Sequence, residues 1–206
     1  MEQLIEQMSS LDNTVYITLI VSYLIGSIPF GLIITKLVGT KDIRLHGSGN
    51  IGATNVLRVA GKTLGVITLL LDMLKGAIVV FVVKETISNH IVLKLSMITV
   101  IIGHIFSIWL KGKGGKGVAT ALASFLIYNY TLGIIGIVSW LITFFITGIS
   151  SLAAIIAFIL LPIVTFIILP KDFYTILLVS SIVFIKHYSN IIRLLKGNEG
   201  RINVKK

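Results

Sequence analysis

The chain has 206 residues, of which 55% are hydrophobic and only 13% are charged, and its mean hydropathy is +1.01. Soluble domains carry about 25% charged residues, so this composition excludes a soluble globular protein and indicates one compact membrane domain over residues 1–206. Cysteine is absent and the four histidines lie far apart, so thiol chemistry is excluded and neither a metal nor another cofactor is expected.

Several segments are long enough to cross a bilayer, which takes about 20 apolar residues. The sequence predicts spans at 14–37, 63–83, 91–110 and 173 to about 195. Between the last two lies a run, 118–170, without Asp, Glu, Lys, Arg or His. As one helix this run would be about 80 Å long, which is too long for a single crossing.

The placement of charge decides how often that run crosses. Basic residues dominate segments 38–62 and 111–117, and the tail contains Lys186, Arg193, Lys196, Arg201, Lys205 and Lys206 against Glu199. The pairs Lys84–Glu85 and Lys171–Asp172 are balanced. Because cytoplasmic loops collect Lys and Arg, the basic segments are predicted to be cytoplasmic and the balanced ones external.

The run must therefore cross an odd number of times, and three short helices fit, with breaks near 129–131 and 148–151. The predicted fold is an all-α integral membrane protein with seven transmembrane helices, its N-terminus outside and its C-terminus cytoplasmic. A re-entrant hairpin remains an alternative for the short fourth span. The net charge of +10 fits basic topology signals, an anionic substrate, or both.

The first unusual cytoplasmic segment is 44–58, which is dense in small and polar residues. Its glycines allow a ligand to approach the backbone, and its polar side chains offer hydrogen bonds. An ordinary turn with capping residues is the simpler interpretation, but a plain loop needs far fewer residues. The candidate residues are Gly47, Ser48, Gly49, Asn50, Gly52, Thr54, Asn55 and Arg58.

The second segment, 111–120, reads KGKGGKGVAT and leads into an apolar helix. Consecutive glycines can turn their N–H groups inward as an anion nest, to which a helix N-terminus adds its positive end. The pattern is not a Walker A loop. A flexible basic loop would explain the lysines but not the glycines. The candidates for binding phosphate are Lys113, Gly114, Gly115, Lys116 and Gly117.

The third segment, 186–199, ends the last span. His187, Asn190 and Arg193 are spaced three apart, which places them along one side of a helix. A histidine, an amide and a guanidinium suit a ligand with several oxygens. Snorkelling residues at a helix end are the alternative, which explains Arg193 better than His187 or Asn190.

Other features fit structural roles at least as well. Asp72 and Lys75 lie inside the second span, either as a functional site or as a mutually satisfied pair. Gly26–Pro29 predicts a kink in the first span. His104 fits a buried, hydrogen-bonded histidine. No carboxylate pair or nucleophilic triad accompanies the three segments, so they suit binding of anionic oxygen and a substrate that is already activated.

These segments closely resemble the PlsY family of bacterial acyl-phosphate:glycerol-3-phosphate acyltransferases. The resemblance covers almost the whole chain through GSIPFG, GSGNIGATNVLR, LDMLKG, GHIFSIWLKGKGGKGVAT and KHYSNIIRLLKGNEG, in this order. It implies a seven-span enzyme of the bacterial cell membrane. That enzyme would transfer a fatty acyl group from acyl phosphate to the sn-1 hydroxyl of glycerol 3-phosphate, giving lysophosphatidic acid and phosphate in the first step of phospholipid synthesis.

The resemblance also implies roles for residues at matching positions. Ser48, Arg58, Lys116, His187 and Asn190 form the implied catalytic set. Ser48 and 114–117 would hold the acyl phosphate, while Arg58, His187 and Asn190 would hold glycerol 3-phosphate. Membrane lipid is expected around the chain, and no nucleic acid partner is expected. The chain departs from the family at Gly112 and Tyr188, which puts in doubt the local loop shape and headgroup affinity.

Two other functions compete with the enzyme. A transporter for an organic phosphate would share the basic loops, but it predicts polar residues through the membrane, and the uncharged run 118–170 speaks against such a path. Inverted repeats, common in transporters, are not visible. A structural scaffold would leave the glycine–lysine loop without a reason.

Overall fold

The computed structural model describes residues 13–202, and within that range the regular structure is helical without strands. The helices are α2 (Asn13–Ser27), α3 (Phe30–Leu37), α4 (Ala53–Ala60), α5 (Lys62–Thr86), α6 (His90–Ile105), α7 (Val118–Tyr128), α8 (Tyr130–Thr147), α9 (Ser150–Ile168), α10 (Phe173–Lys186) and α11 (Tyr188–Leu195). Two short 3-10 turns, η1 (Ile108–Leu110) and η2 (Pro170–Asp172), follow α6 and precede α10.

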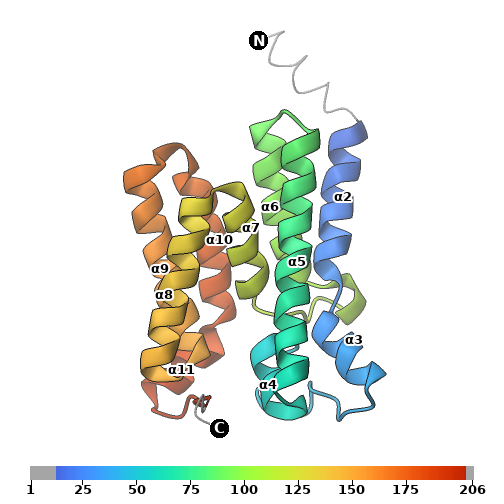
Figure 1. Ribbon diagram of the computed structural model, residues 1–206, viewed down its shortest axis with the longest axis vertical. Coiled ribbons are helices and arrows are strands. Elements are labelled where there is room, and N and C mark those ends of the chain that lie inside the picture. Colours follow the sequence, from blue (N-terminus) through green and yellow to red (C-terminus); the bar gives the residue numbers. More distant parts are fainter. Residues whose placement is uncertain (1–12, 203–206) are drawn as a thin grey trace.

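The long helices form two groups joined by a short one. Helices α2, α5 and α6 stand on one side and α8, α9 and α10 on the other, with α7 between them (Figure 1). Helix α7 packs against both α5 and α8, which come from the two different groups. The short helices α3, α4 and α11 gather at one end of the bundle, at the bottom of Figure 1.

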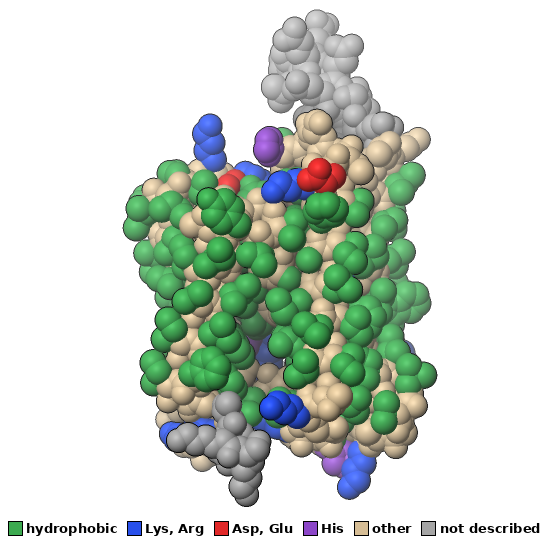
Figure 2. Space-filling model, in the orientation of Figure 1, with side chains coloured by type: hydrophobic (Ala, Val, Ile, Leu, Met, Phe, Trp, Pro, Cys, Tyr) green, Lys and Arg blue, Asp and Glu red, His purple; other side chains and the backbone are tan. Residues whose placement is uncertain are grey.

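The surface is that of a membrane protein. Hydrophobic side chains cover the middle of the visible face, while charged side chains gather near its two ends (Figure 2). Within the described residues, four helical segments are long and apolar enough to span a bilayer, and two bent pairs raise the number to six. The four are 62–86, 90–110, 130–147 and 150–168. The predicted all-helical membrane fold is therefore confirmed, whereas the seven crossings and their orientation remain a prediction.

The fourth predicted span accounts for the difference between the seven predicted crossings and the six candidate spans among the described residues. Helix α7 has 11 residues, so it is about 16 Å long, roughly half of the hydrocarbon core. It begins near mid-height in the bundle rather than at the end where α3, α4 and α11 lie (Figure 1). The loop that precedes it, 111–117, therefore enters the bundle to meet α7.

The breaks predicted from the sequence lie where the chain has the chemistry for them. The first span bends by 44° between α2 and α3, next to Pro29, which has no N–H to continue the helix. Asn129 caps α8 by accepting hydrogen bonds from the N–H groups of Thr131 and Leu132. Gly148 ends α8 with φ at +69°, a conformation that favours glycine. The kink and both helix breaks are confirmed.

The segments predicted to be external meet at one end of the bundle. The Lys94 ammonium lies 2.6 Å from a carboxylate oxygen of Asp172, to which the Tyr128 hydroxyl also donates a hydrogen bond at 2.7 Å. The Lys84 ammonium donates to the Ile127 carbonyl at 2.9 Å. These contacts fasten the C-terminal end of α7 to its neighbours. The predicted external N-terminus, Lys205 and Lys206 lie outside the described residues.

Candidate active site

A cavity of about 310 Å³ lies between the two helix groups. Figure 2 shows a hollow between these groups in the lower half of the molecule, with a basic side chain inside it. All three segments singled out in the sequence contribute to its lining. The predicted residues that line it are Ser48, Asn50, Gly52, Thr54, Asn55, Arg58, Lys116, Gly117, His187 and Asn190.

The first segment is shaped around one buried amide. Asn55 is 1% exposed, and its side-chain oxygen accepts a hydrogen bond from the Ser48 N–H at 2.8 Å. Its NH₂ group donates to the carbonyls of Ile43, His46 and Asn50. The Asn55 amide is therefore engaged with the loop itself rather than turned to a ligand. It fixes the loop that presents Ser48 to the cavity.

The same hydrogen bonds of Asn55 explain why two positions of this loop are glycine. Gly47 has φ at +63°, and a Cβ there would overlap with the Asn55 side-chain oxygen. Gly49 has φ at +70°, which also favours glycine. Neither lines the cavity, in contrast to their predicted role in binding. They let the chain wrap around Asn55.

The glycine–lysine loop differs from the predicted anion nest. The N–H of Gly114 donates to the Ile105 carbonyl at 3.1 Å, and that of Gly115 donates to the His104 carbonyl at 2.9 Å. These N–H groups complete the end of α6 and do not face the cavity. A Cβ on Gly114 would overlap with the backbone of α6, so this glycine allows close packing. Lys113 is exposed and also lies outside the lining.

The anion-binding groups of this segment are Lys116 and the first turn of α7. Gly117, Val118 and Ala119 line the cavity together with Lys116. The N–H groups of a first helical turn have no partner within the helix, and they carry the positive end of its dipole. The Lys116 ammonium donates to the Asn190 side-chain oxygen at 2.5 Å. Burial lowers the pKa of Lys116 to about 8, although the charge of Glu199 opposes this shift.

Glu199 organises the third segment, a role that the sequence analysis did not predict. One carboxylate oxygen accepts hydrogen bonds from Asn190 at 2.6 Å and from Ser151 at 2.8 Å. The other accepts from Nε of Arg193 at 2.6 Å. Burial alone would raise the pKa of Glu199, but these hydrogen bonds lower it, so the carboxylate stays ionised at neutral pH. Arg193 therefore supports the site through Glu199 and does not line the cavity itself.

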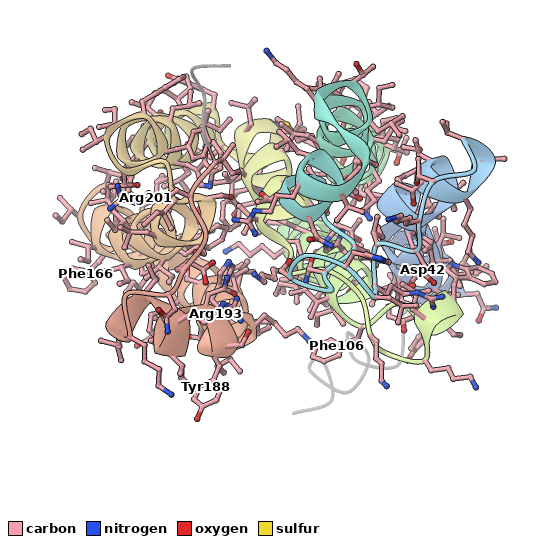
Figure 3. All side chains as sticks on the ribbon, turned by 90° about the horizontal axis from the view of Figure 1, so that it is seen from below. Asp42, Phe106, Phe166, Tyr188, Arg193 and Arg201 are labelled. Carbon is pink, nitrogen blue, oxygen red and sulfur yellow. The ribbon has the colours of Figure 1, made fainter. Side chains whose placement is uncertain are left out.

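The residues after α11, 197–202, form a strap at the end of the bundle where α3, α4 and α11 lie. The Arg58 guanidinium donates to the Gly200 carbonyl at 2.8 Å. The Ile202 N–H donates to the Gly148 carbonyl, also at 2.8 Å. The strap thus connects α4 with the turn between α8 and α9. In Figure 3, which views this end, Arg193 lies near the middle of the bundle and Tyr188 at its edge.

His187 has one ring nitrogen engaged and one available. It is 2% exposed, and its Nδ1 lies 2.8 Å from the Val183 carbonyl. A carbonyl can only accept, so Nδ1 carries the hydrogen and the Nε2 of a neutral ring keeps its lone pair. Because His187 lines the cavity, this arrangement allows it to accept a proton there.

One wall of the cavity is apolar and was not predicted. It is built from α5, α7 and α8, which bring together Leu69, Met73, Leu122, Ile137, Trp140 and Leu141. The other walls carry the cations and hydrogen-bond donors described above. Asp72 and His104 also reach the lining from within the membrane. A cavity with both kinds of wall suits a ligand with an anionic head and an apolar tail.

Known proteins share this sequence and this fold. The family model described as glycerol-3-phosphate acyltransferase matches residues 16–197. A glycerol-3-phosphate acyltransferase of Bartonella henselae is 47% identical over 194 residues, covering 92% of each chain. Its counterpart in Wolbachia pipientis (subsp. Culex pipiens) is 45% identical over 185 residues, covering 89% of this chain and 96% of the relative.

Solved structures agree with these relatives. A crystal structure of PlsY (YgiH), an integral membrane glycerol 3-phosphate acyltransferase, in its glycerol 3-phosphate form superposes with a TM-score of 0.87 at 36% identity. It covers 93% of this chain and 96% of that one. The lysophosphatidic acid form gives a TM-score of 0.84 at 34% identity. The chain therefore belongs to the PlsY family of glycerol-3-phosphate acyltransferases, and it is a membrane-protein acyltransferase of lipid biosynthesis.

Proposed function

We propose that this enzyme transfers a fatty acyl group from acyl phosphate to the sn-1 hydroxyl of glycerol 3-phosphate in the bacterial cell membrane. The products are lysophosphatidic acid and inorganic phosphate, the first step of phospholipid synthesis. The observation that carries this proposal is the cavity itself, which joins a cationic wall to an apolar one. The related PlsY structures, in glycerol 3-phosphate and lysophosphatidic acid forms, support the acceptor and the product.

The acyl phosphate is assigned to the side of the cavity formed by α7. Its phosphate faces Lys116 and the N–H groups of the first turn of α7, and its chain lies along the apolar wall. Ser48, on the opposite loop, offers a hydroxyl to the head. During transfer, the bond between the acyl carbon and the oxygen that links it to phosphorus breaks. The groups named above stabilise the negative charge that the leaving phosphate then gains.

The glycerol 3-phosphate is assigned to Arg58, His187 and Asn190. The Arg58 guanidinium binds its phosphate in place of the Gly200 carbonyl. The sn-1 oxygen attacks the acyl carbon directly, a new ester bond forms, and phosphate departs with the electron pair of the broken bond. The hydroxyl proton goes to Nε2 of His187 or to a phosphate oxygen of the donor. Positioning and electrostatics provide the rate enhancement.

Purified protein with palmitoyl phosphate and glycerol 3-phosphate tests the proposal. We expect release of phosphate together with lysophosphatidic acid in a ratio of one to one. The Ser48→Ala variant is expected to retain single-turnover transfer at a reduced rate, because Ser48 only binds the donor. An enzyme that makes no lysophosphatidic acid would refute the function, and an acyl group trapped on Ser48 would refute direct transfer.

Activity is expected to depend on the protonation of Lys116. Because its pKa is lowered to about 8, the ammonium is lost as the pH rises through that value, and kcat/KM should fall above about pH 8. The matched variant is Lys116→Arg, whose guanidinium stays charged throughout. A pH profile of kcat/KM should show the alkaline decline in the wild type and lose it in Lys116→Arg. A decline that persists in the variant would assign it to another group.

We also propose seven crossings, in which the short helix α7 is the fourth. This topology places Asn129, between α7 and α8, on the external side. A reporter that is active only outside the cytoplasm, fused after Asn129, should be active, and one fused after Gly112 should be inactive. A cytoplasmic result at Asn129 would instead support a re-entrant hairpin.

A further inference from the structure

Three ionisable side chains inside the membrane take no part in the proposed chemistry. Asp72, Lys75 and His104 are each at most 4% exposed. Asp72 and Lys75 lie in α5, and His104 lies near the end of α6. Charged groups are costly at this depth, so their presence calls for a specific role.

Lys75 and Asp72 connect α5 to two neighbouring elements. The Lys75 ammonium lies 2.8 Å from a carboxylate oxygen of Asp72 and donates to the Ile28 carbonyl at 2.9 Å. Ile28 lies in the break between α2 and α3, where the helical hydrogen bonds are interrupted. The Asp72 backbone carbonyl accepts a hydrogen bond from the Thr120 hydroxyl, in the first turn of α7, at 3.0 Å.

His104 lies between this pair and the glycine–lysine loop. Its Nδ1 is 3.5 Å from the Asp72 carboxylate. On its other side, the ring packs so closely on Gly115 that a Cβ there would overlap with it, and the three atoms nearest to that Cβ all belong to the imidazole. The Gly115 N–H also donates to the His104 carbonyl at 2.9 Å. Lys116 follows directly in the chain.

We propose that His104, held by Asp72, is a positioning residue that sets the height of the glycine–lysine loop in the bundle. Through Gly115 it fixes Lys116 and the first turn of α7, the groups to which the acyl phosphate is assigned. This inference rests on the proposed function. It explains why α7 begins inside the bundle, and why a glycine without positive φ stands at position 115.

The contact between the imidazole and Gly115 can be tested from both sides. Gly115→Ala forces the ring or the loop to move, and we expect the KM for acyl phosphate to rise at least about tenfold, because small displacements at a reacting centre are costly. His104→Ala should also raise this KM. In the His104→Ala background, however, the added methyl group has the space that the ring occupied. Gly115→Ala should then change KM by less than about twofold.

Gly114→Ala is the matched control for this cycle. A Cβ on Gly114 would overlap with the backbone carbonyl of His104, which remains in His104→Ala, so its damage should be the same in both backgrounds. The KM for glycerol 3-phosphate should rise less than that for acyl phosphate in the Gly115 and His104 variants, because of its assigned partners only Asn190 contacts Lys116. A loss of folded protein would lower kcat and leave both KM values unchanged.

Asp72 is tested with Asp72→Asn combined with Lys75→Met, so that no buried charge is left alone. This double variant should raise the KM for acyl phosphate more than that for glycerol 3-phosphate. Equal damage by Gly115→Ala in both backgrounds, or an unchanged KM in His104→Ala, would overturn the positioning role. A wild-type KM in the double variant would overturn the part assigned to Asp72. Failure of the proposed function is distinct, since the wild type would then form no product.

Discussion

Replacing Lys116 by methionine is expected to lower kcat/KM by about three orders of magnitude. The substitution keeps the length of the side chain but removes the cation that faces the leaving phosphate in a cavity partly closed to water. Removing one donor from such a site typically costs a factor of 10² to 10³, and here a full charge is removed as well. Steady-state kinetics with palmitoyl phosphate and glycerol 3-phosphate would measure the loss.

Lys113→Met is the control for this prediction. It removes a lysine from the same loop, three residues away, but Lys113 is exposed and does not line the cavity. Its kcat/KM should stay within about twofold of the wild type, because an exposed charge is screened. Equal losses in the two variants would mean that the loop acts through its overall charge, and would contradict the specific place given to Lys116.

Arg58→Lys is expected to raise the KM for glycerol 3-phosphate roughly 30-fold, with a smaller effect on the KM for acyl phosphate. Lysine retains the charge but loses the planar fork that binds two phosphate oxygens at once. It would also lose the geometry of the hydrogen bond to the Gly200 carbonyl, which positions the side chain. Initial rates measured while each substrate is varied would separate the two KM values.

Arg44→Lys provides the comparison. Arg44 lies in the same basic segment, but it is paired with Asp42 at 2.6 Å and does not line the cavity. In Figure 3, Asp42 lies on the side of the molecule away from the gap between the helix groups. Both KM values should remain near those of the wild type. A comparable rise in this variant would show that Arg58 acts through the general basic charge of the surface.

The sequence predicts the helices well because their signals are local. Pro29, Asn129 and Gly148 each end or begin a helix through the chemistry of one residue, and all three breaks are where expected. The crossing count is harder to predict because it depends on depth. The sequence of Val118–Tyr128 alone does not predict that this helix begins inside the bundle. The depth of its first residue depends on the packing of Gly114 and Gly115 against α6.

For the site, too, local features could be predicted from the sequence, whereas features that depend on packing could not. The three basic segments could be singled out because their glycines and amides are unusual for plain loops, and their residues meet at one cavity. The roles within them depend on contacts made between distant parts of the chain. Glu199 is an ordinary acidic residue in the sequence, and it becomes central only when Ser151 reaches it from α9. Asn55 looks like a ligand-binding amide until its hydrogen bonds to the loop are seen.

The hydrogen bonds among the residues of the cavity have a consequence for discrimination among anions. Arg58 is already bonded to the Gly200 carbonyl and Lys116 to the Asn190 side-chain oxygen. An incoming anion must therefore be a better acceptor than the partner it displaces. A phosphate dianion meets this condition, because its negative charge attracts a guanidinium or an ammonium more strongly than a neutral carbonyl or amide oxygen does. Chloride and small carboxylates carry a single negative charge and gain less from the exchange, so the hydrogen bonds within the enzyme disfavour their binding relative to phosphate.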